Sequence, residues 1–386
     1  MGRPGEVSNA AYRRVVDQAK SAGSATHKGE ERDRAGLGLH ELVDPKGFGV
    51  IRRSISWLEP TGKLFKLLRG VAMLVTRRLD TTGSMQENVA IAFECLPDTY
   101  EYLKKVPNAP LDRYDAQMIT EIFGDVKDRY VLCRSQAEVD ERIAEQMTLM
   151  VPEGGGHGNH GEDPQYGLFG SAYLTAADIN KYGLKSYDFT ITDEPARDRL
   201  NIDTLIRVFG EEVMAKVKEN GFEMSKDELP TTKQIITDLS TRAHVFLLLV
   251  GDREDAAQYW PTVISRDRII KIPNTKLLPY YETAIIGLTE GTLTLQNLES
   301  FLVNDAKLGK AHASEVKRNI AGIPLGAQAV LPNFGLLPKR SDMFAKKGDL
   351  WPIGHPNFTG NASVADDAGD DKSKKKKKKK EGAGWL

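Results

Sequence analysis

Cysteine is almost absent from this chain. Its 386 residues include only Cys95, in an apolar run with helical character, and Cys133, in a run that resembles a strand. No CxxC pair is present, so we interpret both as buried thiols rather than as a disulfide or a reactive site. This scarcity excludes the disulfide framework of a small secreted domain.

Long hydrophobic runs are also missing. The longest, such as His244–Val250, have the length of a strand, and none could cross a bilayer. Residues 1–11 lack the apolar core of a secretory signal. We therefore expect a soluble, cytoplasmic protein.

The chain has little excess charge of either sign. It carries 53 basic and 54 acidic residues, a formal net charge of −1. This balance excludes a uniformly basic nucleic-acid-binding surface, although not a local patch. The lysine run Lys374–Lys380 follows the acidic stretch Asp366–Asp371, and like charges in a row repel one another. We interpret this end of the chain as a disordered, solvated tail. The alternative is that the lysine run binds nucleic acid or an anionic surface.

The remaining pattern is one of alternating strands and helices. Apolar runs predict strands at residues 70–79, 116–123, 130–133, 186–192, 244–250 and 268–272. Helical spacing predicts helices at residues 10–19, 88–96 (ended by Pro97), 135–149, 164–175, 203–218, 232–242 and 293–302. This order predicts an α/β fold with a doubly wound, mostly parallel sheet.

Three segments follow from the same pattern. Residues 1–69 form an N-terminal extension, in which a β-hairpin flanks the turn at Pro60-Thr61-Gly62 and residues 21–34 read as a mobile linker. Residues 70–305 form the α/β domain. Residues 306–386 form a Pro/Gly-rich wrap followed by the lysine-rich tail.

Four acids come directly after predicted strands. They are Asp80, Asp125, Asp193 and Asp252. Ligands of open α/β sheets bind beyond the carboxyl ends of the strands, so these acids could gather at the edge where ligands bind. We expect Asp125 to support a turn rather than to bind a ligand.

The turn Asp80-Thr81-Thr82-Gly83-Ser84 has the chemistry of a metal site. Asp80, Thr82 and Ser84 aim three oxygens into one loop, and Gly83 allows the tight turn. Hard cations such as Mg²⁺, or Mn²⁺ and Ca²⁺ in its place, prefer oxygen ligands. The alternative is a cluster of N-cap residues that opens the next helix.

This turn resembles the DxSxS metal-ion-dependent adhesion site (MIDAS) of von Willebrand factor A (vWA) domains, with Thr82 in place of the middle serine. Thr192-Asp193-Glu194 resembles the strand end whose aspartate contacts the metal in that family. The Gly154-Gly155-Gly156 loop resembles the loop that presents a further ligand, for which Glu162 is the best match and Asp163 the next. His157 and His160 in this loop read as flexible loop histidines rather than as zinc ligands.

The resemblance covers about residues 70–305 and implies a Rossmann-like vWA fold with Asp80, Thr82, Ser84, Glu162 and Asp193 around the metal. It implies metal-dependent binding of a partner protein without catalysis. Relatives inside prokaryotic cells act beside AAA+ ATPases or in larger assemblies, which gives a partner class by resemblance alone.

Two features depart from the family pattern. Arg77 and Arg78 interrupt the first strand, which predicts a bulge or an edge that lets both side chains reach solvent. Glu162 in place of a threonine would put three carboxylates around the ion. By Coulomb's law that charge weakens the capture of a carboxylate from the partner.

Two other functions use the same residues. Asp80-Thr81-Thr82-Gly83-Ser84 also resembles the DxTGT motif of haloacid dehalogenase-like phosphotransferases, in which the first aspartate is the nucleophile. The later motif Gly251-Asp252-Arg253-Glu254-Asp255 is one residue short of the pattern in that family. The third possibility is a structural assembly subunit with an incidental metal.

Overall fold

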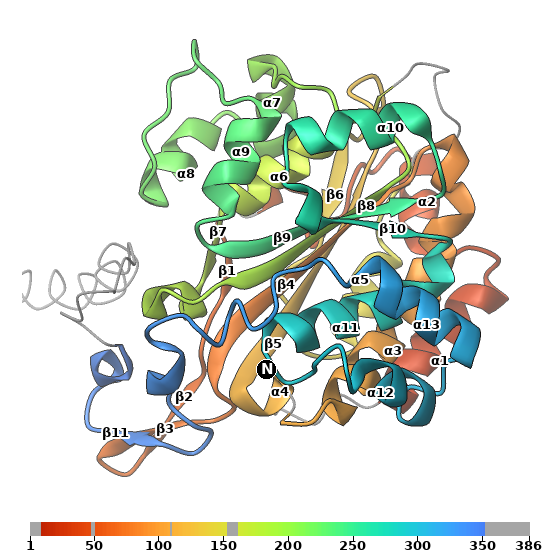
Figure 1. Cartoon of the computed structure of the whole chain (residues 1–386). Helices are drawn as coiled ribbons and strands as arrows, with labels where there is room; N and C mark the ends of the chain where they lie inside the picture. The colour runs from red at the N-terminus through yellow and green to blue at the C-terminus, as the bar shows by residue number, and fades with distance from the viewer. Residues whose placement is uncertain (1–8, 48–50, 109, 153–160, 352–386) are drawn as a thin grey trace, which may run out of the picture.

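The centre of the molecule is a six-stranded sheet in the order β10-β9-β8-β4-β5-β6. The computed structural model describes residues 9–47, 51–108, 110–152 and 161–351 (Figure 1). All strand pairs are parallel except β5–β6. The strands are β4 (Val71–Asp80), β5 (Tyr114–Phe123), β6 (Leu132–Arg134), β8 (Ser186–Thr192), β9 (Ala243–Val250) and β10 (Ile269–Ile272).

The chain changes direction across this sheet between β4 and β8. From β4 it moves outward through β5 to β6, and it then crosses to β8 and continues through β9 to β10 on the other side. The carboxyl ends of β4 and β8 are therefore neighbours at a topological switch point. Open α/β sheets bind ligands at such points.

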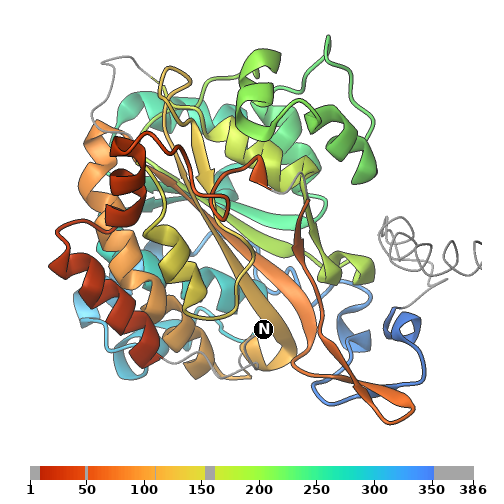
Figure 2. The same cartoon turned by 180° about the vertical axis from the view of Figure 1, so that it is seen from behind.

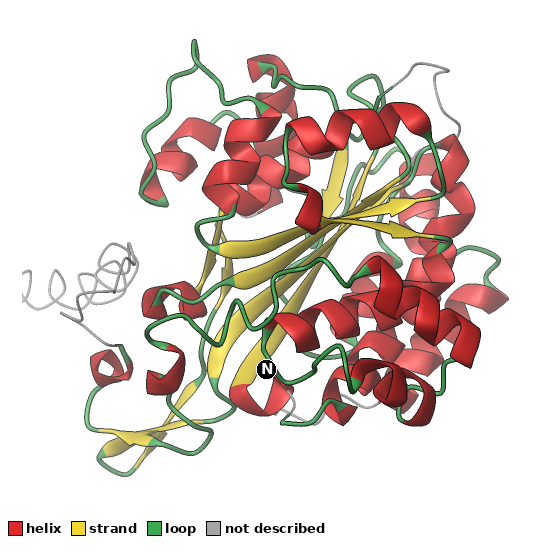
Figure 3. Ribbon diagram, in the orientation of Figure 1, coloured by secondary structure: helices red, strands yellow, loops and turns green. Residues whose placement is uncertain are grey.

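Helices cover both faces of the sheet (Figures 1 and 3). One face packs against α1 (Asn9–Ser21), α3 (Gln86–Lys105), α5 (Arg142–Met147), α11 (Leu278–Thr289), α12 (Leu298–Asn304) and α13 (Lys310–Asn319). The other face packs against α6 (Pro164–Tyr173), α7 (Ile202–Phe209), α8 (Val213–Glu219), α9 (Thr232–Leu239) and α10 (Glu254–Tyr259). Separate hydrophobic clusters fill the two sides. The prediction of an α/β fold with a mostly parallel sheet is confirmed.

The prediction of a mobile linker at residues 21–34 is wrong. Helix α2 (His27–Arg34) occupies most of that segment. The Ser24 and Thr26 hydroxyls donate to Glu30 Oε1 at 2.5 and 2.6 Å, and the Gly29 N–H donates to Thr148 O at 2.9 Å. These bonds order a polar segment that has no apolar stripe of its own.

The helices differ from the predictions in several places. The segment 135–149 is helical only over α5, and the segment 203–218 is divided at Gly210 into α7 and α8. Helix α3 does not stop at Pro97 but continues to Lys105. Helix α11 was not predicted, because all but one of its residues are buried and it therefore lacks the polar face that reveals a helical period.

The predicted N-terminal hairpin is present with shifted bounds. Strands β2 (Leu58–Thr61) and β3 (Leu64–Leu67) pair around Gly62, whose φ of +64° suits a tight turn. The C-terminal β11 (Met343–Phe344) joins β3. The upstream run, in contrast, forms β1 (Arg52–Ser54) and pairs in parallel with β7 (Thr175–Ala177). The tail from residue 352, predicted to be disordered, lies outside the described residues.

Arg77 and Arg78 do not escape to solvent, so the predicted bulge or edge is wrong. Both are fully buried in the central strand β4, whose register with β5 is unbroken. Arg77 donates to Glu282 of α11 (Nε–Oε1 2.7 Å) and to Thr99 of α3 (2.9 Å). On the other face Arg78 donates to Glu121 of β5 (2.7 Å) and Asp188 of β8 (3.0 Å). Neighbouring acids thus neutralise each buried charge.

Helix α6 approaches this network closely at Gly167. A Cβ at this position would lie 2.3 Å from Arg78 Nε and 2.8 Å from Glu121 Oε2. Glycine is therefore required for the helix to lie directly over the ion pair.

Candidate metal centre

Asp80 ends β4 at the switch point and is only 1% exposed. Its Oδ1 accepts hydrogen bonds from the Thr82 backbone N–H (3.0 Å) and hydroxyl (2.7 Å). Its Oδ2 accepts one from the Thr192 hydroxyl at 2.6 Å. Burial raises the pKa of Asp80 to about 6; these hydrogen bonds oppose that rise, and the charge of Asp193 adds to it.

Asp80 differs from other acids at this edge in its electrostatic partners. Asp125 and Asp163 pair with Arg197, and Glu194 pairs with Arg253. No ion pair among the described residues includes Asp80. A buried carboxylate surrounded by hydroxyl groups has the donor chemistry that suits a hard divalent cation.

The turn after Asp80 is fixed to the neighbouring strand. The Thr81 backbone N–H and hydroxyl both donate to Phe123 O at the end of β5, at 3.1 and 3.0 Å. Ser84 lies in the short 3₁₀ helix η2 (Gly83–Met85), and its side chain is outside the described residues. The structure thus places the Asp80 and Thr82 side chains in contact, and their role as metal ligands stays a prediction.

Thr192 is a site residue that sequence reasoning missed. It is the last residue of β8, and its hydroxyl bonds Asp80 and also accepts the Glu194 N–H at 3.0 Å. Asp193 follows it and is half-buried, and its negative charge raises the pKa of Asp80. A hydroxyl residue at the end of a strand that adjoins the switch point is the signal that could have identified it.

Glu162 lies at the same edge. Its side chain is buried, and its backbone pairs with the segment after Asp193: its N–H donates to Pro195 O, and the Arg197 N–H donates to its carbonyl, each at 3.0 Å. No group of three or more His, Cys, Asp or Glu side chains in the described part of the chain is placed to hold a metal ion. The three-carboxylate arrangement with Glu162 therefore stays a prediction.

Asp163, the other match for the glycine loop, is occupied by different partners. Its Oδ2 accepts the Val126 N–H at 2.7 Å and pairs with Arg197, while Gln165 donates to Oδ1 at 2.6 Å. Arg197 Nη2 also donates to Asp125 Oδ2 at 2.6 Å. Asp125 and Asp163 thus stabilise the loops beside the site through their shared ion pairs with Arg197.

Glu194 joins three loops at the rim. Its carboxylate accepts the Gly161 N–H at 3.0 Å and pairs with Arg253, which follows β9. Its carbonyl accepts the Trp260 indole N–H at 2.9 Å.

Asp252 does not join the other acids, because its side chain is 92% exposed and lies 3.3 Å from Lys271 Nζ. Gly154–Gly156, His157 and His160 lie outside the described residues.

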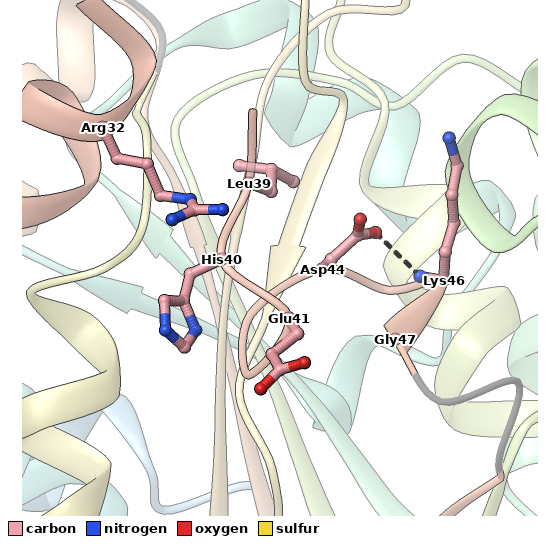
Figure 4. Close-up of a pocket in the computed structure, with 7 residues that line it drawn as sticks. All are labelled: Arg32, Leu39, His40, Glu41, Asp44, Lys46 and Gly47. Atoms are coloured by element: carbon pink, nitrogen blue, oxygen red, sulfur yellow. Dashed lines mark hydrogen bonds between the residues drawn. The ribbon is translucent and has the colours of Figure 1, made fainter. Parts of the chain in front are cut away.

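A separate surface hollow of about 420 Å³ shares no residue with this centre (Figure 4). Seven residues between Arg32 and Gly47 line it. Arg32 is held by Gly38 O (3.0 Å) and Leu37 O (3.3 Å), and Asp44 Oδ1 accepts the Lys46 N–H (2.9 Å). These groups stabilise their own loop, and we assign the hollow no function.

Comparisons with known proteins do not assign a family. No family model matches the chain, and no curated protein matches it. Among solved structures, it resembles proximal thread matrix protein 1 from the mussel byssus, with 11% identity, a TM-score of 0.30, and coverage of 55% of this chain and 46% of that one. It also resembles the pilus adhesin SpaC from Lactobacillus rhamnosus GG in its open conformation, with 13% identity, a TM-score of 0.33, and coverage of 69% and 34%. The matched parts span less than half of each of those chains.

Proposed function

We propose that this chain is a vWA-like module that binds a divalent cation, Mg²⁺ in the first place, and through it another protein, without catalysis. The observation that carries the proposal is the buried Asp80 carboxylate. Two threonine hydroxyls hold it at the switch point, and no cation pairs with it among the described residues. The mostly parallel six-stranded sheet, with β6 as its antiparallel edge, supports the proposed vWA-like architecture.

The proposed ligands are Asp80, Thr82, Ser84 and Asp193, with Glu162 as a further acid. Thr192 orients Asp80, and Thr81 fixes the turn to β5. When bound, the cation supplies a positive charge and an open coordination position for an oxygen of the partner. Arg197 and Glu194 hold the surrounding loops in place.

The charge of the ligands limits the chemistry of the partner. Asp80 and Asp193 already balance a divalent ion, and Glu162 would add a third negative charge. A carboxylate from the partner would then meet a weaker field. We therefore favour a neutral oxygen of the partner at the open position, and a basic group of the partner could pair only with the surplus carboxylate. An AAA+ ATPase or a larger assembly is the partner class that the family resemblance suggests.

Affinity capture from the native source tests the proposal. Wild type and Asp80→Ala are used as baits with Mg²⁺ and with EDTA, and the exposed Asp252→Ala serves as the matched control. A partner retained by wild type and the control in Mg²⁺, but lost in EDTA and with Asp80→Ala, supports it. A partner retained equally by all baits contradicts metal-dependent binding. Phosphatase turnover abolished by Asp80→Asn would favour the haloacid dehalogenase-like alternative instead.

A further inference from the structure

The three-stranded sheet β11-β3-β2 projects from the body of the molecule at the lower left of Figure 1 and the lower right of Figure 2. Residues opposite each other on antiparallel strands share a face. The register pairs Leu58 with Leu67 and Pro60 with Phe65 on one face. Thr61 with Leu64, and Lys66 with Met343, lie on the opposite face.

The two faces differ in burial. Leu67 is fully buried, and Leu58 and Phe344 pack against the main hydrophobic cluster. On the opposite face Leu64 is 41% and Met343 43% exposed. Trp57, two residues before Glu59 on this face, is 56% exposed, and its carbonyl continues the ladder by accepting the Leu68 N–H at 3.0 Å. The outward face thus presents three large apolar side chains to solvent.

Basic side chains surround this face. One acid, Glu59, lies opposite Lys66 on the same face, and Lys347 Nζ lies 5.7 Å from the ring centre of Phe65 on the other face. The cations on or beside the outward face are Lys63, Lys66, Lys339, Arg340 and Lys346. None of them forms an ion pair with another residue that the structure describes. The nearby Asp342 and Asp349 instead accept backbone N–H groups, from Lys339 at 2.8 Å and Lys346 at 3.0 Å. We call these five cations, with Trp57, Leu64 and Met343, the hairpin surface.

The free edge of β2 is not suited to strand addition. The two-residue turn Gly62-Lys63 makes Thr61–Leu64 a hydrogen-bonded pair, so the next residue, Pro60, directs its backbone outward. Proline has no N–H to offer a further strand. A partner would therefore contact the face and the tip of the hairpin rather than extend the sheet.

We propose that the hairpin surface docks onto an anionic lipid membrane. Trp57, Leu64 and Met343 enter the interfacial region, while the surrounding cations contact lipid phosphates. Binding of this kind sums apolar insertion with a gain of about fivefold for each cation near the surface. Trp57 is the one aromatic ring of the hairpin surface, and Leu64 and Met343 carry none. Single-stranded nucleic acid is bound by aromatic side chains on which successive bases stack, so this composition favours lipid.

The proposal is independent of the metal centre, so its test is carried out in EDTA. The full chain is sedimented with vesicles of phosphatidylcholine alone and of phosphatidylcholine mixed with phosphatidylglycerol. A chain with Lys374–Lys380 changed to glutamine separates the contribution of the lysine run. We expect binding to the mixed vesicles to be at least about tenfold tighter than to phosphatidylcholine, and to weaken with salt.

The variants Leu64→Ser with Met343→Ser, and Lys63→Gln with Lys66→Gln, test the hairpin surface. Each pair should lower the affinity for the mixed vesicles about tenfold or more, also in the chain without the lysine run. The matched controls Leu37→Ser, at a side chain that is 62% exposed, and Lys226→Gln should bind as wild type does. Unchanged binding by both hairpin variants overturns the proposal, as does binding to a single-stranded oligonucleotide without binding to vesicles.

Discussion

The Thr192 hydroxyl donates to Asp80 Oδ2 at 2.6 Å and joins the ends of two neighbouring strands whose residues are 112 positions apart in the chain. This bond sets the orientation of the carboxylate on which the candidate metal centre depends. The same hydroxyl accepts the Glu194 N–H, so Thr192 holds both the Asp80 carboxylate and the backbone of the loop that follows β8.

Replacing Thr192 with valine should weaken Mg²⁺ binding. The variant keeps the shape of the side chain but removes the hydroxyl that holds Asp80 Oδ2. We expect a loss of roughly tenfold in affinity, the lower end of the range for residues that orient metal ligands. Titration calorimetry measures it, and Thr192→Ser should restore the affinity. Valine and wild type with equal affinities would remove Thr192 from the site.

Replacing Glu162 with threonine tests whether a third acid contributes. If Glu162 is a ligand, as predicted, its loss should lower the affinity for Mg²⁺ several-fold, because one negative charge near the ion disappears. The matched variant Glu162→Gln keeps the size of the side chain. Calorimetric titrations in which all three proteins bind alike would exclude Glu162 from the ligands.

Replacing Arg78 with methionine should destabilise the fold strongly. Glu121 and Asp188 would lose the guanidinium that pairs with them, and both are buried with Arg78. Breaking a buried pair from one side costs about 3–5 kcal/mol. Urea unfolding measures the change, with the exposed Arg13→Met, whose pairs with Asp98 and Glu101 are longer than 3.7 Å, as the control. A change below about 1 kcal/mol, typical of surface pairs, would contradict this role.

Glu290 should make the stability of the fold depend on pH. Burial raises the pKa of Glu290 to about 7, while the Tyr187 and Tyr114 hydroxyls that bond it oppose the rise. The folded state therefore holds a proton that the unfolded chain releases above its ordinary pKa of about 4.3. This contribution to stability is full below that pKa and is lost as the pH rises toward 7.

Glu290→Gln should remove that dependence. In urea unfolding between pH 4.5 and 7, the free energy of unfolding of wild type should fall relative to the variant, by about 3 kcal/mol at most. The exposed Glu254→Gln is the control and should follow wild type. Parallel profiles for wild type and Glu290→Gln would show that the carboxyl is ionised throughout.

The sequence allowed the sheet to be predicted better than the helices. Six apolar runs correspond to the six strands of the central sheet, because buried strands need continuous hydrophobic residues. Helices α2 and α11 were missed because one is too polar and the other too buried to show a helical period. The burial of Arg77 and Arg78 could not be predicted, because the acids that pair with them, Glu282 and Asp188, are more than 100 residues away in the chain.

In the candidate site, contacts between residues close in sequence could be predicted, and contacts that depend on the strand order could not. Asp80 and Thr82 are local neighbours, so their contact follows from the turn itself. Thr192 reaches Asp80 only because β8 lies beside β4, and strand order is not visible in a single sequence. Asp252 also follows a strand, yet it faces solvent, since a position after a strand does not fix the direction of a side chain.

Calorimetric titration of Mg²⁺ into wild type, Asp80→Asn and the control Asp252→Asn tests the central claim most directly. Asparagine keeps the shape of Asp80 and removes its charge, and Asp252 lies exposed after β9, which β8 separates from β4. We predict saturable binding at one site in wild type and in the control, and a loss of at least about tenfold in Asp80→Asn. Equal binding by Asp80→Asn and wild type, or no binding by wild type, would contradict a metal centre at Asp80.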